Sequence, residues 1–280
     1  QFFFRIKKSS FKDLLRLHEM LSTSLKRCVR MCSTTSSDAF VFSAANFANP
    51  DLPGGLSILD VPLTKATDES LLGFGRLSRS RDEYTVASNN FEIVPWPRPT
   101  GARPLDEHTG DEAGTVEGEF AVKWDGDFYL GENKAIESVS NTYLDGLGAP
   151  PEDARRGDDG VGSGDAIHLW MSDFHPDGAQ SFWPMLCGEG ENETASFPFV
   201  VCLGKACEDV TPADMHAFYV PPGCGVYLDP GTWHNGVYVA REHAPATFLT
   251  RQGRVHARVS CSWAYEFNTL LRVPLRMQEA

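Results

Sequence analysis

Short apolar or alternating runs, separated by glycine and proline turns, recur through most of this chain. It has 25 Gly and 18 Pro, and from residue 61 onward no segment keeps a long 3.6-residue apolar period. Many short strands at close spacing are typical of antiparallel sandwiches and barrels. The sequence therefore predicts an all-β domain with a few short helices, one beginning at 67–72. Strands are expected within 91–94, 120–124, 166–171, 197–203, 217–220, 225–228, 246–249 and 255–263.

Charge is divided unevenly along the chain. Residues 1–37 carry eight Lys/Arg and two Asp/Glu, a balance of +6, whereas the remaining residues carry 17 basic and 36 acidic side chains, a balance of −19. A net charge of −13 for the whole chain argues against a nucleic-acid partner. The sequence contains no uninterrupted apolar stretch of about 18 residues, so no transmembrane helix is predicted.

The basic N-terminal segment has its own pattern. Within residues 1–32, leucines and Phe11 recur at spacings of three and four between basic side chains, which predicts an amphipathic helix. Such a basic, acid-poor segment resembles a mitochondrial transit peptide, so a mitochondrial location is predicted, with the cytoplasm as the alternative. The helix is expected to dock on other protein subunits or on an anionic membrane surface, with packing on its own domain as the alternative.

These features predict three parts: a helical extension over 1–37, a linker over 38–60 and a β domain over 61–280. The linker is expected because Asn-Pro-Asp and Pro-Gly-Gly triplets mark turns there. The Asp-, Arg- and Gly-rich stretch 148–164 is expected to be an exposed loop.

Two clusters of polar residues carry the predicted chemistry. The first runs from Asp173 to Pro184 and the second from Gly225 to Asn235. Each places imidazole, carboxylate or amide groups beside turns that end strands, where the mouth of a barrel would lie. Asp173 and His175 alternate at i and i+2, so both are expected on one face of a strand. The candidate catalytic residues are His175, His234, Gln180 and Asp173.

The same clusters suggest a divalent metal as a candidate cofactor. Imidazole with carboxylate is a suitable ligand set for iron, manganese, nickel or zinc. The predicted ligands are His175, Asp229 and His234, and Asp173 is a further candidate. The alternative is that these residues are turn residues whose side chains cap backbone carbonyls.

A third pattern lies near the C-terminus. Arg254, His256 and Arg258 alternate, so they share one face of a strand. That face either binds an anion inside the barrel or is the exposed side of an edge strand.

Several segments together resemble the ureidoglycolate lyase family of cupin-type barrels, over roughly residues 61–275. They are Val61-Pro62-Leu63-Thr64, Gly110-Asp111-Glu112-Ala113-Gly114, Asn141-Thr142-Tyr143-Leu144, His175-Pro176-Asp177-Gly178-Ala179-Gln180, Pro230-Gly231-Thr232-Trp233-His234, Gln252 to Ser260, and Leu271-Arg272-Val273-Pro274-Leu275. The resemblance implies a cupin-type antiparallel β-barrel or jelly roll. It also implies that a small acid, ureidoglycolate, is broken into glyoxylate and urea during purine breakdown through allantoin.

The resemblance also assigns roles and exposes departures. His175 and His234 are the retained imidazoles, and Gln180 is the amide that faces the substrate. Family members usually carry His where this chain has Asp229, and His or Glu where it has Asn235. An Asn side chain cannot act as a base, so the sequence favours a recruited, non-catalytic structural subunit of a larger complex. The alternatives are an active ureidoglycolate lyase and a cupin that binds a metabolite without catalysis.

Overall fold

The computed structural model describes residues 51–94, 103–105, 114–134, 142–155, 164–185, 196–255 and 257–277. The chain divides into two compact units, Gln1–Val41 and Phe42–Ala280. The helical extension predicted over 1–37 lies outside the described residues, as does most of the predicted linker. All elements below belong to the second unit.

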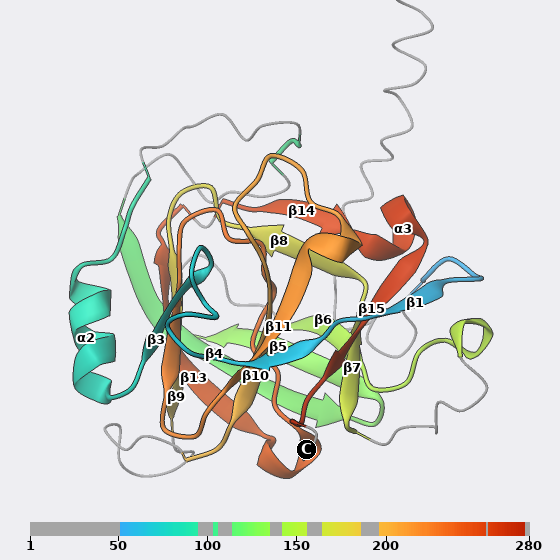
Figure 1. Cartoon of the computed structure of the whole chain (residues 1–280), viewed down its shortest axis with the longest axis horizontal. Helices are drawn as coiled ribbons and strands as arrows, with labels where there is room; N and C mark the ends of the chain where they lie inside the picture. The colour runs from blue at the N-terminus through green and yellow to red at the C-terminus, as the bar shows by residue number, and fades with distance from the viewer. Residues whose placement is uncertain are drawn as a thin grey trace, which may run out of the picture. The chain divides into compact units, whose positions relative to one another are not determined.

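The second unit is built mainly from strands (Figure 1). The described elements are β1 Ser57–Asp60, β2 Leu63–Lys65, β3 Gly75–Ser78, α2 Arg81–Asn89, β4 Thr115–Asp125, β5 Phe128–Lys134, β6 Thr142–Leu147, β7 Ala166–Leu169, β8 Met171–Phe174, β9 Gln180–Met185, β10 Phe199–Gly204, β11 Met215–Val220, β12 Gly225–Leu228, β13 Ala246–Gly253, β14 Val259–Ser262, α3 Trp263–Phe267 and β15 Thr269–Pro274. Short 3₁₀ turns lie at Glu152–Ala154, Pro212–Asp214 and Arg241–His243.

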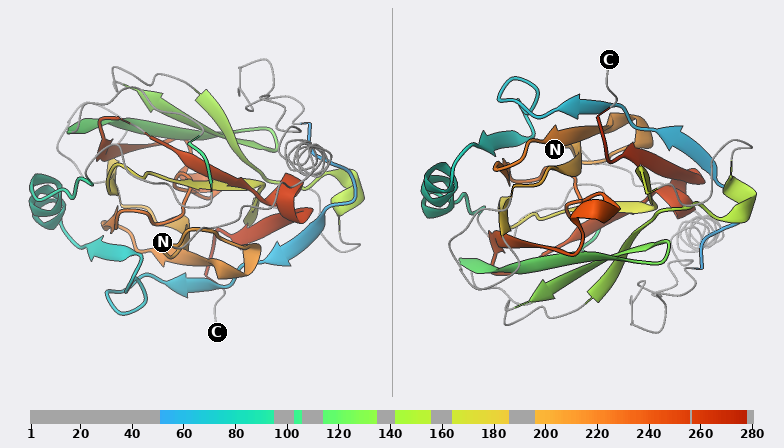
Figure 2. Two further views of the ribbon diagram at one scale, coloured as in Figure 1. Left: turned by 90° about the horizontal axis from the view of Figure 1, so that it is seen from above. Right: turned by 90° about the horizontal axis from the view of Figure 1, so that it is seen from below.

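The described strands form three sheets. The largest has the order β1-β15-β7-β6-β5-β4-β13-β9-β12-β3, and the smaller ones are β10-β11-β2 and β14-β8. Pairing is antiparallel except for β1 with β15 and β2 with β11. Both views in Figure 2 show β4–β6 as a layer on one side and β10, β11 and β2 on the other. The predicted all-β, cupin-like fold is confirmed.

Strand alternation decides which side chains enter the core between these layers. On β13 the side chains of Ala246, Phe248 and Thr250 are buried while their neighbours are partly exposed. Phe248 lies directly opposite Phe120 of β4, and Ala246 lies opposite Val122. Each buried large apolar side chain contributes roughly 1.5–3 kcal/mol, so this seam is a main source of stability.

Three local predictions need correction. The linker predicted over 38–60 ends too late, because residues 57–60 are strand β1. The segment 67–72 is a turn rather than a helix, because the Thr67 and Ser70 side chains cap each other's backbone N–H groups. The run 91–94 makes a single bridge, Ile93 to Gly178, rather than a strand.

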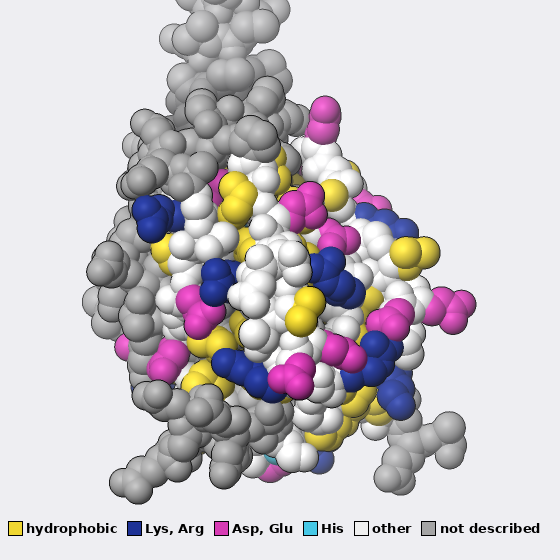
Figure 3. Space-filling model, turned by 90° about the vertical axis from the view of Figure 1, so that its left-hand side faces the viewer, with side chains coloured by type: hydrophobic (Ala, Val, Ile, Leu, Met, Phe, Trp, Pro, Cys, Tyr) yellow, Lys and Arg dark blue, Asp and Glu magenta, His cyan; other side chains and the backbone are white. Residues whose placement is uncertain are grey.

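A helix that the sequence analysis did not predict, α2, follows β3. Its N-cap is Ser80, whose side chain accepts a hydrogen bond from the backbone of Glu83. Tyr84 and Ala87 of α2 are buried. No helix of the described residues is long and apolar enough to cross a membrane. On the side that carries α2, basic and acidic side chains are interspersed (Figure 3). Arg79 and Asp68, for example, form an ion pair at 2.5 Å.

Candidate active site

The candidate site begins at β8 and the turn after it. Met171, Asp173 and His175 alternate along the chain, and all three side chains line one cavity. The backbone of Asp173 exchanges two hydrogen bonds with that of His234, at 2.8 and 2.7 Å between nitrogen and oxygen. This bridge fixes the loop after β12 beside β8, which brings the two predicted clusters together.

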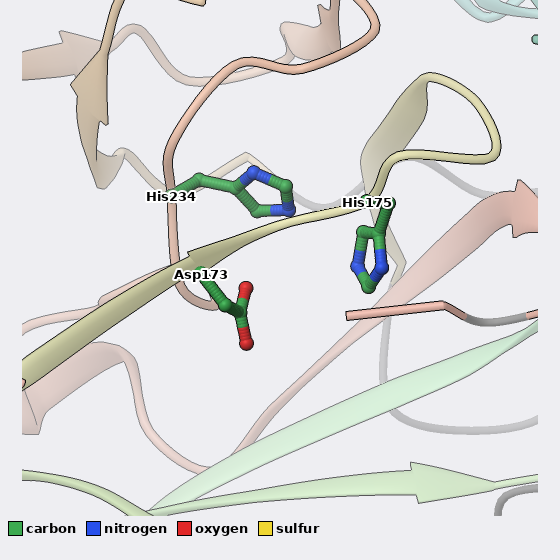
Figure 4. A group of neighbouring side chains, drawn as sticks. All are labelled: Asp173, His175 and His234. Atoms are coloured by element: carbon green, nitrogen blue, oxygen red, sulfur yellow. The ribbon is translucent and has the colours of Figure 1, made fainter. Parts of the chain in front are cut away.

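Asp173, His175 and His234 converge, as Figure 4 shows. The centroids of the two imidazole rings lie 5.3 Å apart. One nitrogen of each histidine and one carboxylate oxygen of Asp173 all lie within 4.8 Å of one another. The two histidines thus face the same interior, as the sequence predicted.

Backbone carbonyls orient both rings. His175 Nδ1 lies 2.9 Å from the Ala257 carbonyl oxygen, and His234 Nδ1 lies 2.7 Å from that of Thr232. Because a carbonyl oxygen can only accept, each Nδ1 carries the proton and donates it. Each Nε2 is therefore the nitrogen with a lone pair, available as a base or as a metal ligand.

His234 is held neutral. Burial, reinforced by the charge of His175, lowers its pKa to about 3, although the hydrogen bond to the Thr232 carbonyl acts in the opposite direction. Its Nε2 lies 2.5 Å from the side-chain amide of Gln180, which continues to Gln252 at 3.2 Å. Because Nε2 accepts, this contact is satisfied when the Gln180 amide turns its NH2 group to the ring.

Two carboxyl groups share the cavity. Burial raises the pKa of Asp173, while the charges of Arg258 and His175 lower it. Burial, reinforced by the charge of Asp173, raises the pKa of Asp145 to about 7. Arg258 Nε lies 3.8 Å from Asp173 Oδ2, so a guanidinium faces the same space. Carboxyl groups with raised pKa in a cavity are typical of functional sites.

The cavity has a volume of about 70 Å³. A single water needs roughly 10–15 Å³ on this scale, so the space suits a small organic molecule. Among the described residues, its wall combines one cation, two carboxyl groups and two imidazoles with the rings of Phe120 and Phe182.

Asp173, His175 and His234 form a set that fits a divalent metal. Zinc binds imidazole nitrogen and carboxylate oxygen at about 2.0–2.2 Å, so the three ligand atoms, which lie within 4.8 Å of one another, would move closer together to bind one ion. The backbone-anchored Nδ1 atoms are the usual support of metal-binding histidines. A metal on His234 Nε2 would displace the Gln180 amide.

Asp229 does not join this group, so its prediction as a metal ligand needs correction. It follows the end of β12 and is partly exposed, and the charges that act on it are Arg76 and Glu92. Val226 and Leu228, on β12 itself, belong to the main core. The carboxylate beside the imidazoles is Asp173 instead.

Some of the remaining predicted residues line the cavity and others do not. Gln180 lines the cavity, with its amide committed to His234 and Gln252. Asn235 also lines it, and its Nδ2 donates to the Met171 carbonyl. Of the Arg254, His256 and Arg258 face, Arg258 reaches the cavity, Arg254 is exposed, and His256 lies outside the described residues.

Asp145 is the site residue that the sequence analysis missed. It lies on β6, in Leu144-Asp145-Gly146, where no neighbouring residue suggests chemistry. Asn133 and Tyr143, which hydrogen-bond to each other, line the same side. The available signal was the proximity of Asp145 to the Asn-Thr-Tyr-Leu segment quoted for the family resemblance.

Comparison with protein families now bears on this geometry. The model of the family described as ureidoglycolate lyase matches residues 135–265, a span that contains Asp145, Asp173, His175, His234 and Arg258. This segment matches the ureidoglycolate lyase family. The resemblance inferred from the sequence is confirmed over this span, which is slightly less than half of the chain. The search of curated proteins found no match.

Proposed function

We propose that this chain is a working carbon–nitrogen lyase of the ureidoglycolate type. The observation that carries the proposal is the cavity lined by His175, Asp173 and Arg258, in which Arg258 Nε lies 3.8 Å from Asp173 Oδ2. The sequence favoured a non-catalytic subunit because Asn235 cannot act as a base. The carboxyl groups of Asp145 and Asp173, together with a correctly oriented His175, supply the acid–base groups whose loss that expectation assumed.

The chemistry requires one proton transfer and one bond cleavage. The reacting carbon of ureidoglycolate carries a hydroxyl, a ureido nitrogen and a carboxylate. A base takes the hydroxyl proton, the oxygen electrons form the carbonyl of glyoxylate, and the C–N bond breaks. The leaving nitrogen then takes a proton and departs as urea. Hydroxyl and nitrogen share one carbon, so one imidazole can accept the proton and return it.

The residues divide these tasks as follows. His175 Nε2 moves the proton, and Asp173 supports the imidazolium that forms. Arg258 pairs with the substrate carboxylate, for which a guanidinium fork is well suited. Neutral His234 and Gln180 form a fixed wall. If Asp173, His175 and His234 instead held a metal, it would polarise the substrate oxygen, and His175 Nε2 would then be a ligand rather than the base.

Release of glyoxylate from ureidoglycolate tests the proposal. The full chain is expected to release glyoxylate above the uncatalysed rate. His175→Ala is expected to lower kcat by about 10²–10⁴, the usual contribution of a positioned base. Asp229→Asn is the matched control, since that carboxylate lies away from the imidazoles, and it is expected to leave kcat within about threefold.

The opposite results favour a different function. A wild-type chain that gives no glyoxylate above the uncatalysed rate rejects the lyase and leaves the structural subunit as the better hypothesis. Equal activity of wild type and His175→Ala shows that the proton moves through another group.

A further inference from the structure

Asp145 carries a buried oxygen that nothing in the described part of the chain satisfies. Its side chain lines the cavity from β6, and Oδ2 is shielded from solvent without a hydrogen-bond partner among the described residues. A buried polar atom normally has a partner, because leaving it without one costs the full desolvation of the group. An orphan acceptor that faces a cavity indicates a donor supplied by a ligand.

The backbone around Asp145 leaves room for this carboxyl and little else. A methyl group at Gly236 would lie 2.6 Å from Asp145 Oδ2 and 2.8 Å from the Phe120 ring. Glycine therefore keeps the carboxyl seated against the loop after His234. Besides burial, the carboxyl of Asp173 raises the pKa of Asp145, and the charge of Asp145 in turn raises the pKa of the phenols of Tyr129 and Tyr238.

The other carboxyl of the cavity differs. Asp173 is within the electrostatic reach of Arg258 and His175, both of which lower its pKa. Arg258 is the cation of the cavity wall, so it is the natural partner for a substrate carboxylate. Asp145 is left to face the part of the substrate that offers hydrogen-bond donors.

We infer that Asp145 binds the ureido group of the substrate. This inference rests on the proposed lyase function and assigns the end of the substrate that the function alone leaves unplaced. A ureido group presents N–H donors beside a carbonyl. An ionised carboxyl accepts two of those N–H groups, and a protonated one accepts an N–H while its O–H donates to the carbonyl. The pairing is therefore available in either protonation state of Asp145.

Two non-reactive probes separate the two ends of the substrate. N-carbamoylglycine has the ureido and carboxylate groups but lacks the hydroxyl, so it cannot eliminate. Glycolate has the carboxylate and hydroxyl but lacks the ureido group. Binding of each is measured by titration calorimetry to the full chain and to Asp145→Ala, Asp145→Asn and Arg258→Gln, with each fold checked by circular dichroism.

Asp145→Ala is expected to weaken the binding of N-carbamoylglycine at least tenfold and to change the affinity for glycolate by less than threefold. Asp145→Asn, whose amide still presents an acceptor beside a donor, is expected to recover part of the loss. Arg258→Gln is expected to weaken both probes, since both carry a carboxylate. Because this pattern differs from the one expected for Asp145→Ala, Arg258→Gln is the matched control.

The outcomes distinguish a failure of the inference about Asp145 from a failure of the proposed lyase function. If the wild-type chain binds both probes and Asp145→Ala weakens both equally or neither, Asp145 does not bind the ureido group, although the lyase proposal survives. If the wild-type chain binds neither probe and releases no glyoxylate, both fail. If Asp145→Ala does not fold, full affinity of Asp145→Leu or a complete loss in Asp145→Asn overturns the inference.

Discussion

Two groups in the cavity respond to pH in opposite directions. His234 resists protonation in the folded chain, so acidification from about pH 6.5 towards 3 favours the unfolded state, which binds the proton. Asp145 binds a proton more readily in the folded chain than in the unfolded one, where its pKa is near 3.8. Its contribution to stability is therefore present below about pH 4 and is lost as the pH rises to 7. The two effects partly cancel between these limits.

Asp145→Asn isolates the second effect. At pH 8 the wild-type carboxyl is ionised in a buried site, which costs folding free energy that a neutral amide does not. The variant is expected to be more stable than wild type by about 4 kcal/mol at pH 8, because the pKa of Asp145 is raised from 3.8 to about 7 and one pKa unit corresponds to 1.36 kcal/mol. The difference is expected to shrink towards zero at pH 4. Urea denaturation at several pH values measures it.

The exposed Asp125, at the end of β4, gives the control for that series. Asp125→Asn is expected to change stability by less than about 0.5 kcal/mol at every pH, as surface substitutions usually do. A stability gain for Asp145→Asn that is constant from pH 4 to 8 would show that ionisation of Asp145 is not its cause.

Within single elements, alternation explains what the sequence could and could not reveal. Asp173 and His175 share a face through their i, i+2 spacing, and two matched turns located His234 opposite them. Strand β12 ends at Leu228, so alternation does not fix the direction of Asp229, which is partly exposed near the charges of Arg76 and Glu92. Asp145 was beyond reach because its direction depends on the pairing of β6 with β5, which contains a register shift.

Strand β1 leads to a prediction of its own. Leu56 and Ile58 are 4% and 8% exposed, and residues 57–60 pair with 269–272 of β15. Deleting residues 1–60 is expected to lower the free energy of unfolding by about 3 kcal/mol or more, because two apolar side chains lose their burial. For a domain of this size, Tm falls by roughly 6–12 °C.

Deletion of residues 1–50 is the paired control for β1, since it leaves the strand intact, and it is expected to change Tm by much less. Equal melting of the two truncated chains would show that β1 adds little to the sheet. Calorimetry on both proteins makes the comparison.

For the molecule as a whole, the charge division sets the main question. Residues 1–37 carry a charge balance of +6. We propose that they dock on another protein or on an anionic membrane surface. Each basic side chain contributes about 1 kcal/mol to binding at such a membrane surface. Deleting them is expected to abolish sedimentation with anionic vesicles or capture of the partner, while Tm stays unchanged. Replacing the eight basic residues with Gln in the full chain is expected to have the same effect.

A truncated chain that still binds but melts at a lower temperature would show that the segment packs on its own domain. The predicted mitochondrial location belongs with this segment and stays a prediction. Its composition was readable from the sequence, but its destination depends on a surface that is not part of the chain.

The pairing of β1 with β15 also governs the order of events during synthesis. The hydroxyl groups of Ser57 and Thr269, which are 212 positions apart in the sequence, form a hydrogen bond. A ribosome that makes about 5–20 residues per second therefore exposes β1 for some ten to forty seconds before its partner emerges. Over that interval an unpaired, half-apolar strand is open to pairing with other chains. Yield of soluble protein should thus depend on the speed of translation and on chaperones that shield the first strand until the last one is complete.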